Sequence, residues 1–425
     1  MTTTNYPLIG ETVYRETLEN GLPVYVFPKP GFGKYFAFFA TRYGGMDSRF
    51  NTDGQWQDTP MGIAHFLEHK MFDTKDGNAL QDLAANGASP NAFTSSAITG
   101  YYFECTEKFE ENLRILLTFV SVPYFSQESV DKEQGIIGQE IRMIEDNPNW
   151  QAFTNLMSAL YQQNPIRNSV AGTQESISYI TAETLYRCHE AFYHPGNMVL
   201  CVAGNVEPDK VCAMAREILP PEGRPFIPRD YGNEPETVSE PLREMLMEVA
   251  TPILQLGFKV RPAETGEASM RQNLLGDLAC EALMGTSSPL YAKLYREGLL
   301  NSSFFYGYEE YPGCTFLIAG GESRDPAAVR DAILAEGKRI GREGLDDALF
   351  HRLKKAAYGN QVRALNSFEH ICIEQAQASF REQDIWTFPE VYQSLSKGDA
   401  EDFIRTWIQR EYASLAVIRP GEADV

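Results

Sequence analysis

A proline-rich segment near the middle of the chain sets the strongest limit on how the chain can fold. The segment contains six prolines, Pro220, Pro221, Pro225, Pro228, Pro235 and Pro241. Proline has no backbone N–H and interrupts both helices and central strands, so this stretch is expected to be a linker. A chain of 425 residues is also too long for one ordinary core. We therefore predict two domains, residues 1–220 and 242–425, joined by a linker at 221–241.

The two halves contain the same kinds of hydrophobic pattern. In the first half, short apolar runs predict strands at 22–27, 35–43, 95–105 and 198–203, and amphipathic periodicity predicts helices at 61–72, 79–86, 108–120, 129–145, 150–161 and 181–192. In the second half, the same reasoning predicts strands at 253–260, 315–320 and 414–418, and helices at 268–284, 326–342, 346–366, 368–381 and 399–411. The segment 51–60 is polar, and we expect it to be irregular.

A faint internal repeat also relates the two halves. The pattern Thr181-x-Glu183-x-Leu185-x-Arg187, followed by a strand, resembles Asp399-x-Glu401-x-Phe403-x-Arg405, followed by another strand. The separation is close to half of the chain. Because a helix followed by a strand is a common ending, the pattern gains weight only together with the linker. The two features together suggest domains of similar build.

The pentapeptide His65-Phe-Leu-Glu68-His69 carries the clearest chemical signal in the sequence. On an α-helix, residues four apart lie on one face, and a residue three positions along lies beside them. His65 and His69 can therefore bind one metal ion, with Glu68 held close to it. This H-x-x-E-H order is the inverzincin arrangement. The alternative is a helix with two histidines that are merely exposed or hydrogen-bonded.

A catalytic zinc site has three protein ligands and one position for water, so a third ligand is needed. The best source is the segment 131–145, in which Glu133 and Glu140 are seven residues apart and share one helix face. Glu140 lies among isoleucines, where an unpaired carboxylate is costly. The alternative is the ordinary solvated face of an acidic helix. The remaining histidines are expected to be structural or surface residues: His189, His194, His351 and His370.

Glu68 has a specific role in such a site. It is expected to take a proton from the zinc-bound water, whose pKa the metal lowers. It would then pass that proton to the departing amine, while zinc polarises the carbonyl. The predicted reaction is the hydrolysis of an amide.

Composition limits the partners and the compartment. The net charge of −21 argues against nucleic acid and anionic membranes, since both need basic patches. The seven cysteines form no C-x-x-C motif, so we expect reduced, mostly buried thiols in a cytosolic protein. The first residues do not have the pattern of a secretory signal, and no apolar run approaches the roughly 18 residues of a membrane span.

The sequence around the pentapeptide resembles the active-site signature of the pitrilysin/insulinase peptidases, a family that includes insulin-degrading enzyme and the mitochondrial processing peptidase. The resemblance rests on the segments Gly62-Ile-Ala-His65-Phe-Leu-Glu68-His69-Lys-Met-Phe72, Asn86-Gly-Ala-Ser-Pro-Asn-Ala-Phe-Thr-Ser95, Tyr101-Tyr-Phe103, Asp131-Lys-Glu133-x6-Glu140 and Tyr193-His-Pro-Gly-Asn-Met198. It is strong over residues 15–210 and looser over 240–420. It is greatest for the short bacterial members of the family.

The resemblance implies a fold and a metal site. The fold is α+β, with two similar domains that are each a mainly antiparallel sheet covered by helices. The site is one Zn²⁺ ion per chain, bound by His65, His69 and Glu140. The resemblance also implies that Glu68 is the catalytic base and that Glu133 is a carboxylate supporting a ligand from outside the metal's own contacts.

The resemblance also points to residues that contact a peptide substrate. Asn91, Ala92 and Phe93 fall where the family pairs an edge strand with an extended substrate, although core packing is an open alternative for Phe93. In the second domain, family members place an Arg and, seven residues later, a Tyr that grip the substrate carbonyl. Arg296 lies in this region, but the residue seven positions later is Ser303. Either the alignment shifts or the pair is missing, and then a partner subunit would supply it.

These observations lead to one main functional prediction and two alternatives. We predict a cytoplasmic bacterial zinc metallopeptidase, an endopeptidase or oligopeptidase that hydrolyses extended peptides. One alternative is a subunit of a homodimer or heterodimer, in particular the catalytic half of a processing protease that needs a motif-less homologue. The other is a non-enzymatic peptide-binding or scaffold subunit. No nucleic-acid partner and no membrane span are expected.

Overall fold

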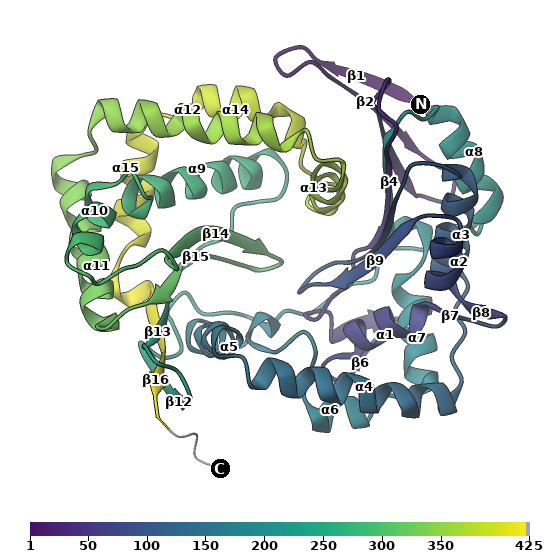
Figure 1. Ribbon diagram of the computed structural model, residues 1–425, viewed down its shortest axis with the longest axis horizontal. Helices are drawn as coiled ribbons and strands as arrows, with labels where there is room; N and C mark the ends of the chain where they lie inside the picture. Colours follow the sequence, from purple (N-terminus) through teal and green to yellow (C-terminus); the bar gives the residue numbers. More distant parts are fainter. Residues whose placement is uncertain (422–425) are drawn as a thin grey trace. The chain divides into compact units, whose positions relative to one another are not determined.

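Hydrophobic strands, mostly from the first half of the chain, form the sheet beside which the predicted site lies. In the computed structural model, which describes residues 1–421, the order of this sheet is β1-β2-β3-β11-β4-β10-β9 (Figure 1). Neighbouring strands are antiparallel, except that β3 and β11 are parallel. The strands are β1 (Thr2–Tyr6), β2 (Glu11–Thr17), β3 (Pro23–Pro28), β4 (Tyr35–Thr41), β9 (Ser89–Thr94), β10 (Thr99–Cys105) and β11 (Met198–Gly204).

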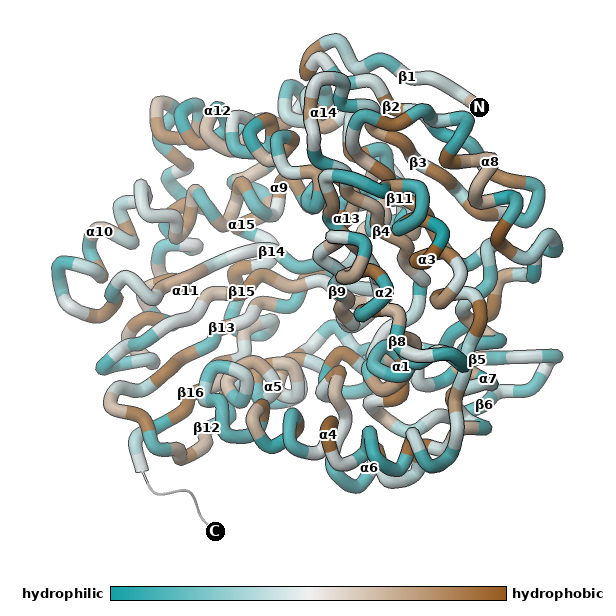
Figure 2. The backbone as a smooth tube through the Cα atoms, turned by 45° about the vertical axis from the view of Figure 1, so that its right-hand side comes forward, coloured by the Kyte–Doolittle hydropathy of each residue, from teal (hydrophilic) through white to brown (hydrophobic). Residues whose placement is uncertain are grey.

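A second, smaller sheet forms in the later part of the chain. Its order is β12-β16-β13-β15-β14, and again one pair, β12 with β16, is parallel. The strands are β12 (Leu242–Met247), β13 (Ile253–Val260), β14 (Phe305–Tyr311), β15 (Cys314–Glu322) and β16 (Ala413–Pro420). Figure 2 shows hydrophobic residues along central strands such as β3 and β16. The two sheets confirm the predicted α+β class with two mainly antiparallel, helix-covered sheets.

Helices cover both faces of each sheet. Beside the first sheet lie α1 (Ile63–Met71), α2 (Ala79–Ala85), α3 (Phe109–Ser121), α4 (Gln127–Glu145), α6 (Gln174–Ser178), α7 (Ala182–Phe192), α8 (Pro208–Ile218) and α13 (Phe368–Phe380). Beside the second lie α5 (Pro148–Leu160), α9 (Glu267–Met284), α10 (Pro289–Arg296), α11 (Pro326–Glu343), α12 (Asp347–Ala364), α14 (Phe388–Ser394) and α15 (Lys397–Trp407). None of the helices described here has both the length and the hydropathy to cross a bilayer.

The contacts group the chain into two compact units that are not contiguous in sequence. Unit 1 contains residues 1–141, 169–230 and 362–386, and unit 2 contains 142–168, 231–361 and the chain from Thr387. The predicted domain boundaries stay a prediction. The structure adds that two segments pack with the sheet formed mainly by the other half of the chain.

These two segments are α5 and α13, which play reciprocal roles. Helix α13 packs on β4 and β11 of the first sheet, where Ile371 and Cys372 join a core that includes Phe36, Phe38 and Val199. Helix α5 packs on β12, β13 and β16 of the second sheet. In Figure 1, each of these helices lies on the face of its sheet opposite the other helices of its unit. Each sheet therefore depends on a helix that is distant in sequence.

The proline-rich segment has no helix, as expected, but it is fixed to the protein along its length. Its first part belongs to unit 1. The Asn51 N–H donates to the Pro228 carbonyl at 2.9 Å, and the Asp230 N–H donates to the Arg49 carbonyl at 3.0 Å. The Arg229 guanidinium pairs with Asp47 at 3.0 Å, and both side chains are 2% exposed. Residues 220–230 are thus docked on unit 1 through a buried ion pair.

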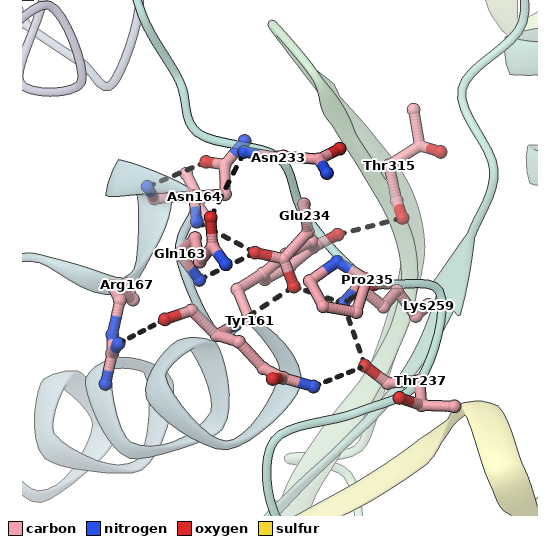
Figure 3. A network of polar contacts seen from close by, with 12 residues as sticks. Tyr161, Gln163, Asn164, Arg167, Asn233, Glu234, Pro235, Thr237, Lys259 and Thr315 are labelled. Carbon is pink, nitrogen blue, oxygen red and sulfur yellow. Dashed lines mark hydrogen bonds and ion pairs between the residues drawn. The ribbon is translucent and has the colours of Figure 1, made fainter.

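The second part of the segment belongs to unit 2, where Glu234 holds it (Figure 3). The Glu234 carboxylate accepts the backbone N–H groups of Gln162, Gln163 and Asn164 at 3.0, 2.7 and 2.8 Å, and it pairs with buried Lys259. Burial raises the pKa of Glu234, but these donors outweigh burial and hold the pKa below its usual value. Burial also lowers the pKa of the Lys259 ammonium, more than Glu234 raises it. This network fixes the segment to the turn that follows α5 and to β13.

The internal repeat is present in the structure, but in a different register from the one predicted. Thr181 and Ser396 are the N-caps of α7 and α15, and both form capping boxes. Each helix leads through a short 3₁₀ turn into a strand, β11 from Met198 and β16 from Ala413. The equivalent of Thr181 is therefore Ser396 and not Asp399. The sequence alignment was about one helical turn too late because helical patterns repeat at that spacing.

The expectation for residues 51–60 was wrong. Strands β5 (Arg49–Thr52) and β6 (Gln55–Asp58) pair as a hairpin around Asp53-Gly54, both with positive φ. Asp-Gly is a strong signal for a two-residue hairpin turn, and it was hidden by the polar composition of these strands. Helices α8, α10 and α14 and strands β1, β12 and β14 were also missed. The predicted strand 95–105 begins only at Thr99.

Candidate metal centre

Helix α1 carries the H-x-x-E-H motif in a buried position. It begins after Gly62, whose φ of 89° is unfavourable for other residues. A Cβ at Gly62 would also lie 2.5 Å from the Ala171 carbonyl oxygen, so only glycine fits here. Phe66 and Leu67 are fully buried, and the helix packs on β9, β10 and α7. These apolar anchors fix the orientation of the polar residues on the same helix.

Helix α4 supplies the opposing carboxylates. The Gln174 amide donates to the Gly138 carbonyl of α4 at 2.7 Å, and the Gln134 amide donates to the Ile177 carbonyl at 3.3 Å. These contacts hold α4 against the segment that leads into α7. As a result Glu133 and Glu140 both face α1.

The predicted ligands come together. His65 Nε2 lies 3.5 Å from Glu140 Oε1, and His69 Nε2 lies 3.6 Å from Glu140 Oε2. The ligand atoms of the three residues all lie within 4.8 Å of one another. The two imidazole rings are 4.7 Å apart and meet edge to face, so their Nε2 atoms converge from different directions. The geometry thus supports Glu140 over Glu133 as the third ligand.

The spacing fits a zinc ion. Zinc binds nitrogen and oxygen ligands at about 2.0–2.2 Å, so two ligands at a tetrahedral angle lie about 3.4 Å apart. The observed separations of 3.5 and 3.6 Å are close to this value. The Glu140 side chain is 40% exposed, which leaves the group accessible from one side. A tetrahedral site with three protein ligands and one open position is compatible with this arrangement.

Glu133 contacts His69 on the side of the ring away from Glu140. Its Oε1 lies 3.0 Å from His69 Nδ1. An ionised carboxylate can only accept, so in the neutral ring Nδ1 carries the hydrogen and Nε2 is left with its lone pair toward Glu140. This is the usual way in which a carboxylate fixes the tautomer of a metal-binding histidine. By contrast, the buried Nδ1 of His65 has no hydrogen-bond partner within residues 1–421.

The electrostatics of the site favour a bound cation. Burial lowers the pKa of His69, but the hydrogen bond to Glu133 and the charges of Glu68, Glu133 and Glu140 together raise it. Contact with His65 lowers the pKa of Glu140, and this outweighs the effect of partial burial. Negative charge therefore accumulates between α1 and α4, where a metal ion can compensate it.

Glu68 lies beside the candidate metal-binding group, which consists of His65, His69 and Glu140, and is not part of it. It is 8% exposed, and its Oε2 accepts a hydrogen bond from Thr94 Oγ1 at 2.9 Å. Burial raises the pKa of Glu68, although His65 and Thr94 partly oppose this effect. Thr94 is at the end of β9, and Thr99 of β10 donates to its hydroxyl at 3.3 Å. The edge hairpin thus orients the Glu68 carboxyl group.

The predicted substrate-binding residues of β9 lie on an open edge. Strand β9 pairs with β10 and is the last strand of the sheet formed by the described residues. Asn91 is exposed, and its Oδ1 accepts the Ala92 N–H at 2.9 Å. The Phe93 ring stacks on Phe38 at 5.8 Å and packs against the core covered by α13. For Phe93, the structure therefore supports the core-packing alternative.

Arg296 is exposed at the end of α10 in unit 2. Its Nε donates to the Ala292 carbonyl of the preceding turn at 3.1 Å. Ser303 is exposed and its hydroxyl donates to Asn301 at 2.6 Å. Tyr306, three residues further on, donates its hydroxyl to Glu281. An Arg and Tyr pair with the family spacing is thus not assembled in this segment.

The other histidines and the cysteines have no role in the group. His189 and His194 are buried, and burial lowers the pKa of each to about 4. His189 contacts the Val120 carbonyl at 3.0 Å. His351 is exposed, whereas His370 is partly exposed. All seven cysteines are free and buried.

Four residues around the site were not singled out from the sequence. Thr94 binds Glu68, and Lys70, Asp73 and Ser129 form a polar cluster beside Glu133. A signal for Ser129 was available, since it is four residues before Glu133 and shares its helix face. Lys70 gave a weaker signal, as a lysine in a buried helix. Nothing in the sequence pairs Thr94 with Glu68, because their contact depends on the tertiary fold.

Comparisons with known proteins agree with this geometry. A model of the insulinase family, peptidase family M16, matches residues 53–174, and a model of the peptidase M16 inactive domain matches residues 179–357. YmfH of Bacillus subtilis strain 168, described as an uncharacterized zinc protease, is 37% identical over 425 residues, which cover 98% of each chain.

Solved structures show the same fold over almost all of the chain. An M16-like peptidase from Alicyclobacillus acidocaldarius has a TM-score of 0.92 and 32% identity, and the match covers 96% of this chain and 98% of that one. A protease from Helicobacter pylori, 19% identical, shares the fold with a TM-score of 0.82 over 96% of this chain and all of that one. The resemblance predicted from the sequence is confirmed, and this chain belongs to the M16 (insulinase) peptidase family.

Proposed function

We propose that this protein is a zinc-dependent endopeptidase or oligopeptidase that hydrolyses extended peptides. The observation that carries the proposal is the convergence of His65 Nε2 and His69 Nε2 on the Glu140 carboxylate, with Glu68 next to them. His65, His69 and Glu140 would hold one zinc ion. The family of the chain and the zinc proteases among its relatives support this choice of metal.

Glu68 is the proton carrier of the proposed reaction. When bound, zinc supplies a Lewis acid that polarises a carbonyl and makes water more acidic. Thr94 engages Oε2 of Glu68, so Oε1 is the oxygen that takes a proton from water and returns it to the leaving amine nitrogen. Burial raises the pKa of Glu68 toward the neutral range in which a general base is most effective.

The open edge of β9 is the proposed binding place for the substrate backbone. An extended peptide can add to this edge as another strand, with Asn91 and Ala92 offering main-chain groups. The Ala92 N–H is bonded locally by Asn91, so binding would exchange this contact for one with the peptide. Phe93 would support the strand from the core side.

A substitution that removes the charge of the base but keeps its shape tests the proposal. Glu68→Gln should lower cleavage of a fluorescence-quenched peptide by about 100- to 10,000-fold, because the proton carrier is lost. The zinc content of the variant should equal that of the wild type, since Glu68 is not a ligand. Asp277→Asn, an exposed carboxylate-to-amide change on α9, is the matched control and should leave turnover unchanged. Normal turnover by Glu68→Gln would refute the mechanism.

A second candidate is the catalytic subunit of a two-chain protease. It is favoured by the segment around Arg296, where the Tyr306 hydroxyl is engaged by Glu281 and Ser303 occupies the position of the family Tyr. A homologous partner, or a second copy of the chain, would then supply the substrate grip. Light scattering and peptide cleavage on the purified chain decide between the two. A fully active monomer would rule out this candidate.

The compartment is part of the proposal. The seven free, buried cysteines fit a reducing environment, so we place the protein in the bacterial cytoplasm. A non-enzymatic scaffold role remains the outcome if the purified protein holds no zinc and cleaves no peptide. In that event the acidic group between α1 and α4 would need another explanation.

A further inference from the structure

Lys70 is a buried cation next to His69 that the proposed reaction does not use. Its side chain is only 3% exposed. Its ammonium contacts the Asp73 carboxylate and the Ser129 hydroxyl, and it lies 3.7 Å from Glu133 Oε2. Burying an ammonium without partners is costly, so these contacts are needed to offset the cost of its burial. Lys70 therefore joins α1 to β7 (Asp73–Thr74) and to α4.

Glu133 connects this cluster to the metal-binding group. One carboxylate oxygen contacts His69 Nδ1 at 3.0 Å, and the other faces Lys70 at 3.7 Å. His69 and Lys70 are consecutive residues and project about 100° apart around the helix. A carboxylate that contacts both cannot rotate freely about its own axis. Its orientation toward the imidazole is thereby fixed.

Ser129 extends the same effect along α4. Ser129, Glu133 and Glu140 are spaced by four and seven residues, so all three lie on one face of the helix. Ser129 also donates to Asp73 at 2.8 Å, which closes the cluster between the two segments. The contacts of Lys70 thus fix the beginning of the helix face that ends with the ligand Glu140.

We propose that Lys70 is a positioning residue, which holds Glu133 in the orientation that fixes His69 and thereby slows the loss of the metal. This inference rests on the proposed zinc site. The two histidines differ in a way that makes the role important. The Nδ1 atom of His65 has no hydrogen-bond partner in the described chain, whereas Nδ1 of His69 contacts Glu133. The orientation of the histidine rings is therefore supported through His69, Glu133 and Lys70.

Removal of the ammonium without loss of the apolar stem is the direct test. The holoprotein of Lys70→Met should release zinc to a chromophoric chelator about 10-fold faster than the wild type, at the lower end of the 10- to 100-fold effect of a lost support. Lys29→Met is the matched control, because Lys29 is a mostly buried lysine of the same unit that pairs with Glu11. The control should release zinc at the wild-type rate.

A double-mutant cycle shows whether Lys70 acts through Glu133. Glu133→Gln alone should also release zinc faster. If Lys70 acts through this carboxylate, adding Lys70→Met to Glu133→Gln should change the rate little further. An unchanged rate in Lys70→Met, or the same acceleration in the Glu133→Gln background, would overturn the inference.

Two outcomes need separate treatment. If Lys70→Met fails to fold, as judged by circular dichroism, Ser129→Ala removes one contact of the ammonium and keeps the charge. It should still release zinc faster than the wild type, and an unchanged rate would overturn the inference. If the wild type binds no zinc, the proposed function fails. If the wild type binds zinc and Lys70→Met retains it equally well, only the role of Lys70 fails.

Discussion

The two sheets carry equivalent helices in the same order, but within residues 1–421 only the first has a cluster of side chains beside it that could hold a metal ion. Along the chain, α1 comes after β4 and before the edge hairpin β9–β10. In the same way, α9 comes after β13 and before the edge hairpin β14–β15. Each helix packs on its own edge strand, α1 on β9 and α9 on β14. The helices α4 and α12 follow at corresponding points of the two halves. The scaffold is thus repeated, whereas the chemistry is not.

The difference lies in the side chains that the two helices present. Helix α1 presents Glu68 to Thr94 of its hairpin and His65 and His69 to α4. Helix α9 instead has Gly276 directly against the Tyr308 ring. A Cβ at Gly276 would lie 2.5 Å from ring atoms of Tyr308. Within residues 1–421, the group formed by α1 and α4 is the one cluster found that could hold a metal ion. The same fold is thus possible with and without a candidate metal site, and a few side chains determine which of the two is present.

The largest effect is expected from loss of the carboxylate ligand on α4. Glu140→Gln removes the negative charge between the two Nε2 atoms. Loss of a supporting residue typically lowers metal affinity by about 10- to 100-fold, and the loss of zinc affinity here should be larger. Peptide cleavage should be lost with it. Zinc titration of the purified protein measures the effect. Glu128→Gln, an exposed change in the first turn of α4, is the control and should bind zinc normally.

A second test compares the two docked ends of the proline-rich segment. Glu234→Gln in unit 2 leaves the buried Lys259 without its charged partner, so the free energy of unfolding should fall by about 3–5 kcal/mol. The pKa of Glu234 is lowered in the folded protein, so its ionised form contributes stability above the unfolded pKa of about 4.3, and this is lost at lower pH. Urea unfolding of both proteins at neutral pH and below about pH 4 measures this. The difference in unfolding free energy between the variant and the wild type should be smaller in acid.

If that difference were the same at both pH values, the Glu234 carboxylate would not be the stabilising group. The docked end in unit 1 would then be the more important one, since Arg229 and Asp47 are as deeply buried there.

The reciprocal helices provide a matched pair of core substitutions. Ile371→Ala on α13 and Leu156→Ala on α5 each empty a fully buried position, and each should cost about 2–5 kcal/mol of unfolding free energy. Exposed changes on the same helices, Glu369→Gln, which keeps an oxygen to accept the Tyr102 hydroxyl, and Asn149→Ala, should stay within about 0.5 kcal/mol. Urea denaturation checks all four. A negligible cost for Ile371→Ala alone would contradict the packing of α13 on the first sheet.

The smallest expected effects test the repeat itself. Thr181→Ala and Ser396→Ala each remove the N-cap of an equivalent helix and should each cost about 1 kcal/mol. The melting temperatures should fall to a similar degree in both variants. Thr181→Ser, which keeps a capping hydroxyl, should retain most of the wild-type melting temperature. A large difference between the two would show that the repeated helices do not contribute alike.

The sequence was most informative where the chemistry is local. The spacing within one helix was enough to predict the pairing of His65 with His69, and the two candidates on α4 were visible from a seven-residue interval. Spacing alone could not separate Glu140 from Glu133 as the candidate ligand, because both lie on one helix face. The resemblance to the peptidase family implied Glu140, and the distances in the structure favour the same residue. The same holds for Thr94, whose hydroxyl reaches Glu68 from another element.

The fold was predictable in class but not in its long-range packing. Central strands and long helices have strong periodicity, and most were predicted close to their observed bounds. Edge strands such as β1 and β14 have weaker patterns because one side faces solvent. The exchange of α5 and α13 could not be foreseen, since amphipathic periodicity shows that a helix has a buried face but not which sheet covers it.

The position of α13 has a consequence for the synthesis of the protein. The strands of the first sheet are complete once β11 has been made, but one face of its core waits for residues 368–380. At about 5–20 residues per second, the ribosome needs on the order of ten seconds or more to reach them. During that time an apolar surface around Phe36, Phe38 and Val199 is uncovered. The nascent chain is therefore a natural client for chaperones that shield such surfaces until translation is nearly finished.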